Sequence, residues 1–193
     1  VMPDAYWLEG LKRDPCHAGC LLGMAKYCCQ MGRLDEAERY VRRGLASLTK
    51  FNMHTQSGDP YYLLGLILEA QERPDEAYDA YYKASWNGGA AARSMGRLAC
   101  LDLRRGDPAA AIRHANTALR HDADHPLAPV VLVLAHRALG ETETADAILA
   151  QAMQNDRMNY LLRWLGGVDR AYFFSKLDAA PDQTVLDMVF DLE

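Results

Sequence analysis

The chain has 193 residues, of which 50% are hydrophobic and 24% charged, a composition typical of globular proteins. Its 21 basic and 26 acidic residues give a net charge of −5 (21 − 26), which disfavours a nucleic-acid partner because phosphate binding needs a basic surface. No apolar run reaches the ~18 residues of a membrane-spanning helix, and no secretory signal opens the sequence, so we expect no membrane partner. The five cysteines lack the spacing of a disulfide scaffold and predict reduced thiols in a cytoplasmic protein.

Residues 3–15 predict one helix, which carries Trp7 and Leu11 and stops at Asp14-Pro15 because proline cannot continue a helix. This segment looks like the second helix of a two-helix unit whose first helix is missing. We therefore expect a half repeat at this end of the chain.

Small residues at a fixed interval predict that helix pairs follow. The same interval, about 34 residues, separates Ala77 from Ala111 and Ala111 from Ala145. Ala37 precedes Ala77 by one such unit plus an insertion at 52–57, and a glycine stands five positions before three of these alanines, at 32, 106 and 140. The shared period predicts four full repeats, spanning residues 18–51, 58–91, 92–125 and 126–159.

The second of these repeats has the clearest pattern. It reads Tyr61-x2-Leu64-Gly65-x2-Leu68, then Ala77-x3-Tyr81 and Ala84. This pattern resembles the tetratricopeptide repeat (TPR), a pair of antiparallel helices with a unit of about 34 residues. The resemblance implies an all-α, TPR-like right-handed helical-repeat solenoid in which Gly65 and Ala77 allow two helices to approach closely. The sequence departs from the family at Glu72, where a turn glycine is usual.

After residue 159 the period weakens. Residues 160–181 predict an irregular helical linker with a turn at Gly166-Gly167, and residues 182–193 predict the start of a further repeat. Half repeats at both ends lack the polar caps of a finished solenoid, so we expect a piece of a longer array. Exposed edges of this kind make a homodimer through the half repeats an open alternative.

A weaker resemblance concerns the run Leu48-Thr49, Leu64-Gly65 and Ala84-Ser85-Trp86. It is similar to the helical-repeat regions of large bacterial proteins, in which the array follows a β-rich, carbohydrate-enzyme-like domain of unknown function. This resemblance implies, as an alternative function, a helical accessory domain of a larger carbohydrate-active bacterial enzyme.

Motifs for catalysis or for cofactor binding are missing from the sequence. Neither GxGxxG nor GxxxxGK[ST] occurs, and Gly88-Gly89 predicts a turn between helices. Cys16, His17, Cys20 and Cys28 could form a zinc site, but CxxC pairs are absent and Cys28 falls at a core position. The run from His121 to His125 is a polar turn between repeats. We therefore predict no metal, no cofactor and no catalytic residue.

Asp102 and His136 are unusual because they occupy equivalent core positions of repeats three and four, one repeat unit apart, where repeats one and two have Cys28 and Leu68. One alternative is a buried carboxylate–imidazole pair, in which each group satisfies the other. The other alternative is that rotation of the helices leaves both side chains partly in solvent.

In the TPR family the first helices of the repeats line a concave groove that binds peptides. The family's groove positions, carried over to this sequence, point to seven binding residues: Lys26, Tyr62, Glu69, Arg93, Arg97, Arg104 and Arg137. No asparagine accompanies them, which disfavours the carboxylate clamp of chaperone-tail adaptors. The arginines suit a helix or extended segment with acidic groups, or alternatively serve only solubility.

The predicted function is a non-catalytic protein–protein interaction scaffold. Its partner would be a peptide, or a neighbouring domain of the same polypeptide, bound in the concave groove. A regulator that binds a small ligand in the groove is a third alternative.

Overall fold

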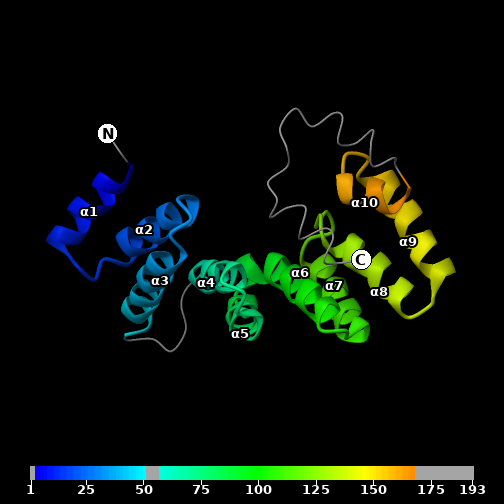
Figure 1. The fold of residues 1–193 in the computed structure, drawn as a ribbon, viewed down its shortest axis with the longest axis horizontal. Coiled ribbons are helices and arrows are strands. Elements are labelled where there is room, and N and C mark those ends of the chain that lie inside the picture. The colour runs from blue at the N-terminus through cyan, green and yellow to red at the C-terminus, as the bar shows by residue number, and fades with distance from the viewer. Residues whose placement is uncertain (1–2, 51–56, 168–193) are drawn as a thin grey trace. The chain divides into compact units, whose positions relative to one another are not determined.

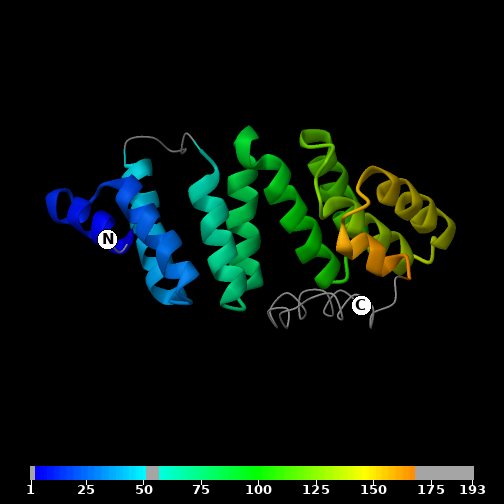
Figure 2. The same ribbon diagram turned by 90° about the horizontal axis from the view of Figure 1, so that it is seen from above.

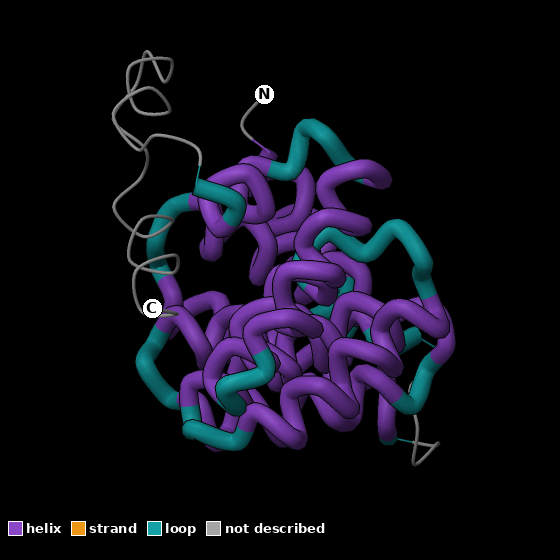
Figure 3. Tube along the Cα trace, turned by 90° about the vertical axis from the view of Figure 1, so that its right-hand side faces the viewer, coloured by secondary structure: helices purple, strands orange, loops and turns teal. Residues whose placement is uncertain are grey.

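The computed structural model describes residues 3–50 and 57–167, and within these ranges every regular element is a helix (Figure 3). The all-α prediction is therefore confirmed. The helices are α1 (Pro3–Arg13), α2 (Ala18–Gln30), α3 (Leu34–Thr49), α4 (Asp59–Ala70), α5 (Pro74–Ser85), α6 (Gly88–Arg104), α7 (Pro108–His121), α8 (Ala128–Ala138), α9 (Thr142–Asn155) and α10 (Tyr160–Leu165) (Figure 1). Residues 52–56 of the predicted insertion, residues 168–181 of the linker and the predicted repeat start at 182–193 lie outside the described residues.

The chain divides into two compact units, Val1–Ser94 and Met95–Glu193, and α6 contributes residues to both. In the first unit α1 packs on α2, and two helical hairpins follow, α2 with α3 and α4 with α5 (Figure 2). The hairpins bury the small and aliphatic residues that the repeat pattern singles out, among them Ala37, Val41, Leu68 and Ala77. The buried stripes of these amphipathic helices explain why the helices pair.

A residue with positive φ reverses the chain within each hairpin. Gly32, Gly106 and Gly140 have φ values of +70°, +77° and +79°, a backbone region that glycine adopts without a Cβ penalty. Glu72 occupies the equivalent position of repeat two and has a φ of +58°. The turn geometry therefore persists where the glycine is absent, and Glu72 carries local backbone strain.

Close packing between α4 and α5 occurs at Gly65, as its size predicts. A Cβ built on Gly65 would lie 2.5 Å from Cε1 of Tyr81, so the nearest group is this aromatic ring rather than Ala77. Tyr81 is fully buried, and its hydroxyl donates to Oε2 of Glu69 at 2.8 Å. Gly65 thus leaves space for the ring of Tyr81, whose hydroxyl is held by Glu69.

The second unit has two hydrophobic clusters. The first joins Ala99 of α6, Ala111 and Ala115 of α7, and Val131 and Ala135 of α8. The second lies further along the chain and is made by the opposite side of α8 with α9 and α10. α8 therefore packs on both α7 and α9.

The structure contradicts the proposed pair of Asp102 and His136. Asp102 is 4% exposed, but its carboxylate lies 2.5 Å from Nδ1 of His114 on α7. His136 Nδ1 lies 2.6 Å from Oε2 of Glu141, in the turn that follows α8. Each side chain finds its partner on the second helix of its own repeat, or in the turn before that helix, because these elements are nearer than the equivalent helix of the next repeat.

The turn predicted at Gly88-Gly89 is also wrong, since α6 begins at Gly88. The side-chain oxygen of Asn87 accepts from the backbone N–H of Gly89 at 3.2 Å, which stabilises the first turn of the helix. Ala90 and Ala91, the next two residues, are buried. The turn predicted at Gly166-Gly167 is present, and Gly167 has a φ of +84°.

Candidate functional site

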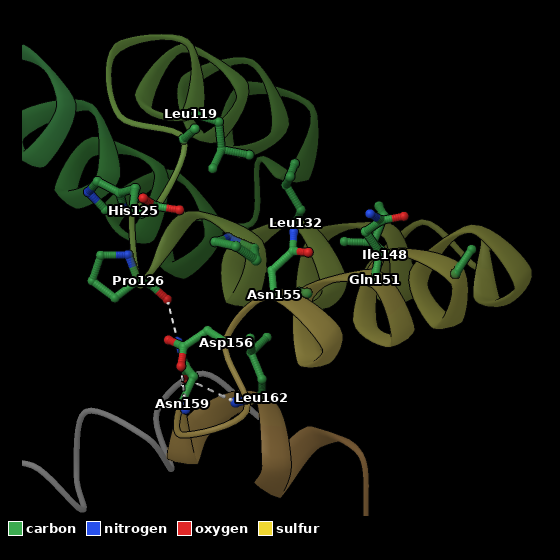
Figure 4. Close-up of a pocket in the computed structure, with 15 residues that line it drawn as sticks. Leu119, His125, Pro126, Leu132, Ile148, Gln151, Asn155, Asp156, Asn159 and Leu162 are labelled. Carbon is green, nitrogen blue, oxygen red and sulfur yellow. Dashed lines mark hydrogen bonds between the residues drawn. The ribbon is translucent and has the colours of Figure 1, made fainter.

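The second unit contains an open cleft of about 700 Å³. Side chains from the end of α7, from α8 and from α9 line it, together with the segments that precede α8 and α10 (Figure 4). α7 and α9 both pack on α8, and the cleft lies over α8 between them. Its volume falls within the range of about 300–1,000 Å³ that is usual for ligand sites.

Aliphatic side chains form the apolar wall of the cleft. Leu119 comes from α7, Leu132 from α8, and Ile148 and Ala147 from α9. Leu132 is nearly buried, Leu119 and Ile148 are half-buried, and Ala147 is exposed. An apolar side chain of a ligand could remove this surface from water, with a gain of about 25 cal/mol per Å².

His125 lines the cleft and lies three residues before the start of α8. Its Nδ1 accepts from the backbone N–H groups of Leu127 and Ala128, at 3.3 and 3.2 Å. Burial lowers the pKa of His125, although the nearby Asp122 carboxylate opposes that shift. A neutral imidazole is what this arrangement requires, because a protonated Nδ1 could not accept. The absence of a Cβ on Gly96 leaves space for the ring.

Polar side chains border the cleft on α9 and after it. Gln151 and Asn155 are exposed, four residues apart, and no other described residue forms a hydrogen bond with either amide. Asp156 Oδ1 accepts from the N–H groups of Met158 and Asn159, both at 3.1 Å. Asn159 Nδ2 donates to the carbonyl oxygen of Pro126 at 2.9 Å, which ties the start of α10 to the start of α8 (Figure 4).

Three of the predicted binding residues gather in the first unit, on α4 and the beginning of α6. The guanidinium of Arg93 lies 4.5 Å from the ring centroid of Tyr62 and forms an ion pair with Asp59. The ring of Tyr62 lies 5.5 Å from that of Tyr81, which donates to Glu69. These contacts connect Arg93, Tyr62 and Glu69 through Tyr81, and the Asp59 carboxylate competes with any acidic ligand for Arg93.

The other four predicted residues are Lys26 in the first unit and Arg97, Arg104 and Arg137 in the second unit. Lys26 is exposed on α2, Arg97 is half-buried on α6, and Arg104 is exposed in the last turn of α6. Arg137 Nη2 on α8 lies 3.4 Å from both Asp146 Oδ1 and the carbonyl oxygen of Leu165. None of the seven predicted residues lines the cleft of the second unit.

The cysteines and histidines considered for zinc do not converge. His17 Nδ1 accepts from the N–H of Cys20 at 3.1 Å and so caps α2. Cys28 is fully buried, and this burial raises the pKa of its thiol, which disfavours the thiolate a metal needs. Across residues 3–50 and 57–167, no three potential ligands from His, Cys, Asp and Glu stand close enough to hold an ion.

None of the described helices is long and apolar enough to cross a lipid bilayer.

Sequence reasoning missed the cleft because no motif marks it. A weaker signal was present in the helix caps. His17, His125 and Asn159 occupy equivalent positions of the repeat period, and each accepts from a backbone N–H of the helix that follows it. The run from His121 to His125 therefore contains a side chain that accepts from the N–H groups at the start of α8 and that lines the cleft.

Comparison with known proteins identifies one repeat of the chain and its fold. Residues 58–85 match the tetratricopeptide repeat family. MamA is similar over 80% of this chain and 86% of its own, with a TM-score of 0.71 and 19% identity. YrrB, described as a TPR protein with an unusual peptide-binding site, is similar over 86% of this chain and 82% of its own, with a TM-score of 0.68 and 17% identity. A structure of Naa15/Naa10 bound to HypK-THB matches 98% of this chain but only 30% of the chain it matches there, with a TM-score of 0.54 and 19% identity. The chain therefore has the tetratricopeptide-repeat fold, and its residues 58–85 are a repeat of that family.

Proposed function

We propose that the chain is a non-catalytic protein-interaction module and that the cleft of its second unit holds a peptide segment of a partner protein. The observation that carries the proposal is the cleft itself, about 700 Å³ of open space beside an apolar wall. A cleft of this size accommodates part of a segment but leaves the rest of the partner outside. The peptide-binding site described for the YrrB relative supports this type of ligand.

The amides of Gln151 and Asn155 support a peptide over a purely apolar ligand. Each side-chain amide offers two donors and one acceptor, the groups that complement the main chain of a peptide. Both face solvent at the cleft without a hydrogen bond to another described residue, so a ligand would not have to displace an internal partner. Hydrogen bonds of this kind add specificity to the apolar contacts.

A random-peptide display library selected on the full chain tests the proposal. The variant Ala147→Phe places a ring in the cleft, whereas Ala150→Phe adds the same ring at an exposed position of α9 that does not line it. We expect peptides that bind the parent and the Ala150→Phe variant but lose affinity for the Ala147→Phe variant. Peptides that bind all three proteins equally would place the interaction elsewhere, and the absence of any selected peptide would refute the proposal.

Three of the seven groove positions, Tyr62, Glu69 and Arg93 of the first unit, form a second proposed surface. The cluster of Tyr62, Glu69 and Arg93 favours an extended or helical segment that packs against the half-buried ring of Tyr62. An Arg93→Glu variant tests this surface in the same selection, independently of Ala147→Phe.

A further inference from the structure

We infer that the cleft of the second unit selects extended segments in which an apolar side chain is flanked by lysine or arginine. This inference rests on the proposed function and specifies the chemistry of the partner. It follows from the charges that line the cleft and from the spacing of its amides.

The charged groups of the cleft are acidic. Asp124 and Asp156 both line it, whereas no lysine or arginine does so among the described residues. The Asp124 carboxylate has no ion-pair partner in the described chain, and both hydrogen bonds that the Asp156 carboxylate accepts go to its Oδ1 atom. Two carboxylates at the border of an apolar cleft therefore remain available to a cationic side chain.

Helix ends reinforce the negative potential. α7 ends at His121 and α9 at Asn155, directly before the segments that contain Asp124 and Asp156, and the C-terminus of a helix carries partial negative charge. The N-termini of α8 and α10 oppose this potential, but N–H groups at the start of each helix already donate to His125 and to Asn159, respectively.

Two basic residues are sequence neighbours of cleft-lining residues but do not themselves line the cleft. Arg120, which follows Leu119, donates to the hydroxyl of Thr117 at 2.8 Å, and Arg157 is exposed after Asp156.

The spacing of the Gln151 and Asn155 side-chain amides favours a ligand whose main chain is extended. Gln151 and Asn155 are four residues apart on α9, which places them about 6 Å apart along the helix axis. Alternate residues of an extended chain repeat every ~6.4–6.8 Å, and they point to the same side. One extended segment could thus bond both amides and place an apolar side chain against Leu132 and Ile148. The flanking residues would then lie beside the carboxylates.

Three nine-residue peptides test the selection. All contain the core Ala-Leu-Ala-Leu-Ala, and the two residues at each end are lysine, serine or glutamate. We expect the lysine peptide to bind the full chain roughly tenfold more tightly than the serine peptide because it forms exposed ion pairs with the two carboxylates, and we expect the glutamate peptide to bind most weakly. Fluorescence anisotropy measures all three affinities, and added salt should narrow the difference.

A variant pair assigns the effect to the two carboxylates. Asp124→Asn/Asp156→Asn removes both charges while Asn retains the Oδ1 acceptor that holds Met158 and Asn159. The control Asp79→Asn/Glu143→Gln removes the same charge from residues outside the cleft. We expect the preference for lysine to disappear in the first variant and to persist in the control.

The outcomes separate the inference from the proposed function. If the three peptides bind equally, or if the glutamate peptide binds best, and Ala147→Phe abolishes binding, then the charge selection is wrong while the cleft remains a peptide site. If the preference for lysine survives in Asp124→Asn/Asp156→Asn, the two carboxylates are not its source. If no peptide binds, or if Ala147→Phe has no effect, both the inference and the cleft function fail.

Discussion

Replacement of Gly65 by alanine tests the packing of the first unit most directly. A Cβ at this position would lie 2.5 Å from Cε1 and 2.6 Å from Cδ1 of Tyr81, whereas carbon atoms in contact are ordinarily about 3.5–4.0 Å apart. One group must therefore move by about 1 Å. The ring has little freedom to do so, because it is fully buried and its hydroxyl is held by Glu69 at 2.8 Å.

The expected magnitude combines three effects. Overpacking of a core typically costs about 1–3 kcal/mol, and disturbance of the hydrogen bond from Tyr81 to Glu69 costs about 1 kcal/mol. The higher helix propensity of alanine returns about 1 kcal/mol. We therefore expect Gly65→Ala to lower the free energy of unfolding by about 1–3 kcal/mol.

Urea denaturation followed by far-UV circular dichroism measures this change, and amide hydrogen exchange of α4 locates it in the first unit. Gly88→Ala is the matched control, since a Cβ there meets no atom within 4 Å and its φ is not positive. The same substitution should stabilise the protein at Gly88, by about 0.4–1 kcal/mol. If Gly65→Ala were neutral or stabilising while Gly88→Ala behaved as expected, the contact with Tyr81 would not limit the packing of α4 on α5.

Three further predictions concern single side chains. Glu72→Gly should raise the free energy of unfolding by about 0.5–1 kcal/mol, because a φ of +58° strains a residue that has a Cβ. The greater entropy of glycine in the unfolded chain offsets only part of this gain. An unchanged urea midpoint would contradict the prediction. His125→Asn should keep an acceptor for the N–H of Ala128, as Asn159 Oδ1 accepts from Leu162, but it should remove a pH dependence of the free energy of unfolding. Burial lowers the pKa of His125, so below the ordinary value of 6.5 the unfolded chain binds a proton that the folded chain does not. The free energy of unfolding of the parent should therefore fall as the pH drops below 6.5, and that of the variant should fall less steeply. Equal pH dependence of the two proteins would show that His125 does not change its protonation on unfolding. His114→Ala should lower the free energy of unfolding by about 2–3 kcal/mol, because it leaves the buried carboxylate of Asp102 without a partner. The double variant Asp102→Leu/His114→Ala has the leucine and alanine that repeat two has at the equivalent positions, and it should recover most of that loss. A double variant as unstable as His114→Ala would refute this account.

The fold was predictable because its signals are local. A constant interval between small side chains reflects a helical hairpin, and hairpins form between segments adjacent in the chain. The same interval located the turns, including the one at which Glu72 replaces glycine and retains the positive φ. The function of the groove positions is untested, although the structure does bring Tyr62 and Arg93 into contact as neighbours on one surface.

The sequence by itself determined the helices, their pairing and the buried small residues, since amphipathic periodicity and turn chemistry act over short distances. Only the tertiary structure decided which partner each unusual side chain meets. Asp102 pairs with His114 rather than with His136, and the ring of Tyr81 fills the space above Gly65. The cleft of the second unit was likewise decided by the tertiary structure, because it depends on how α7 and α9 pack against α8. That packing follows from the combined shapes of many side chains from separate repeats, which no single motif encodes.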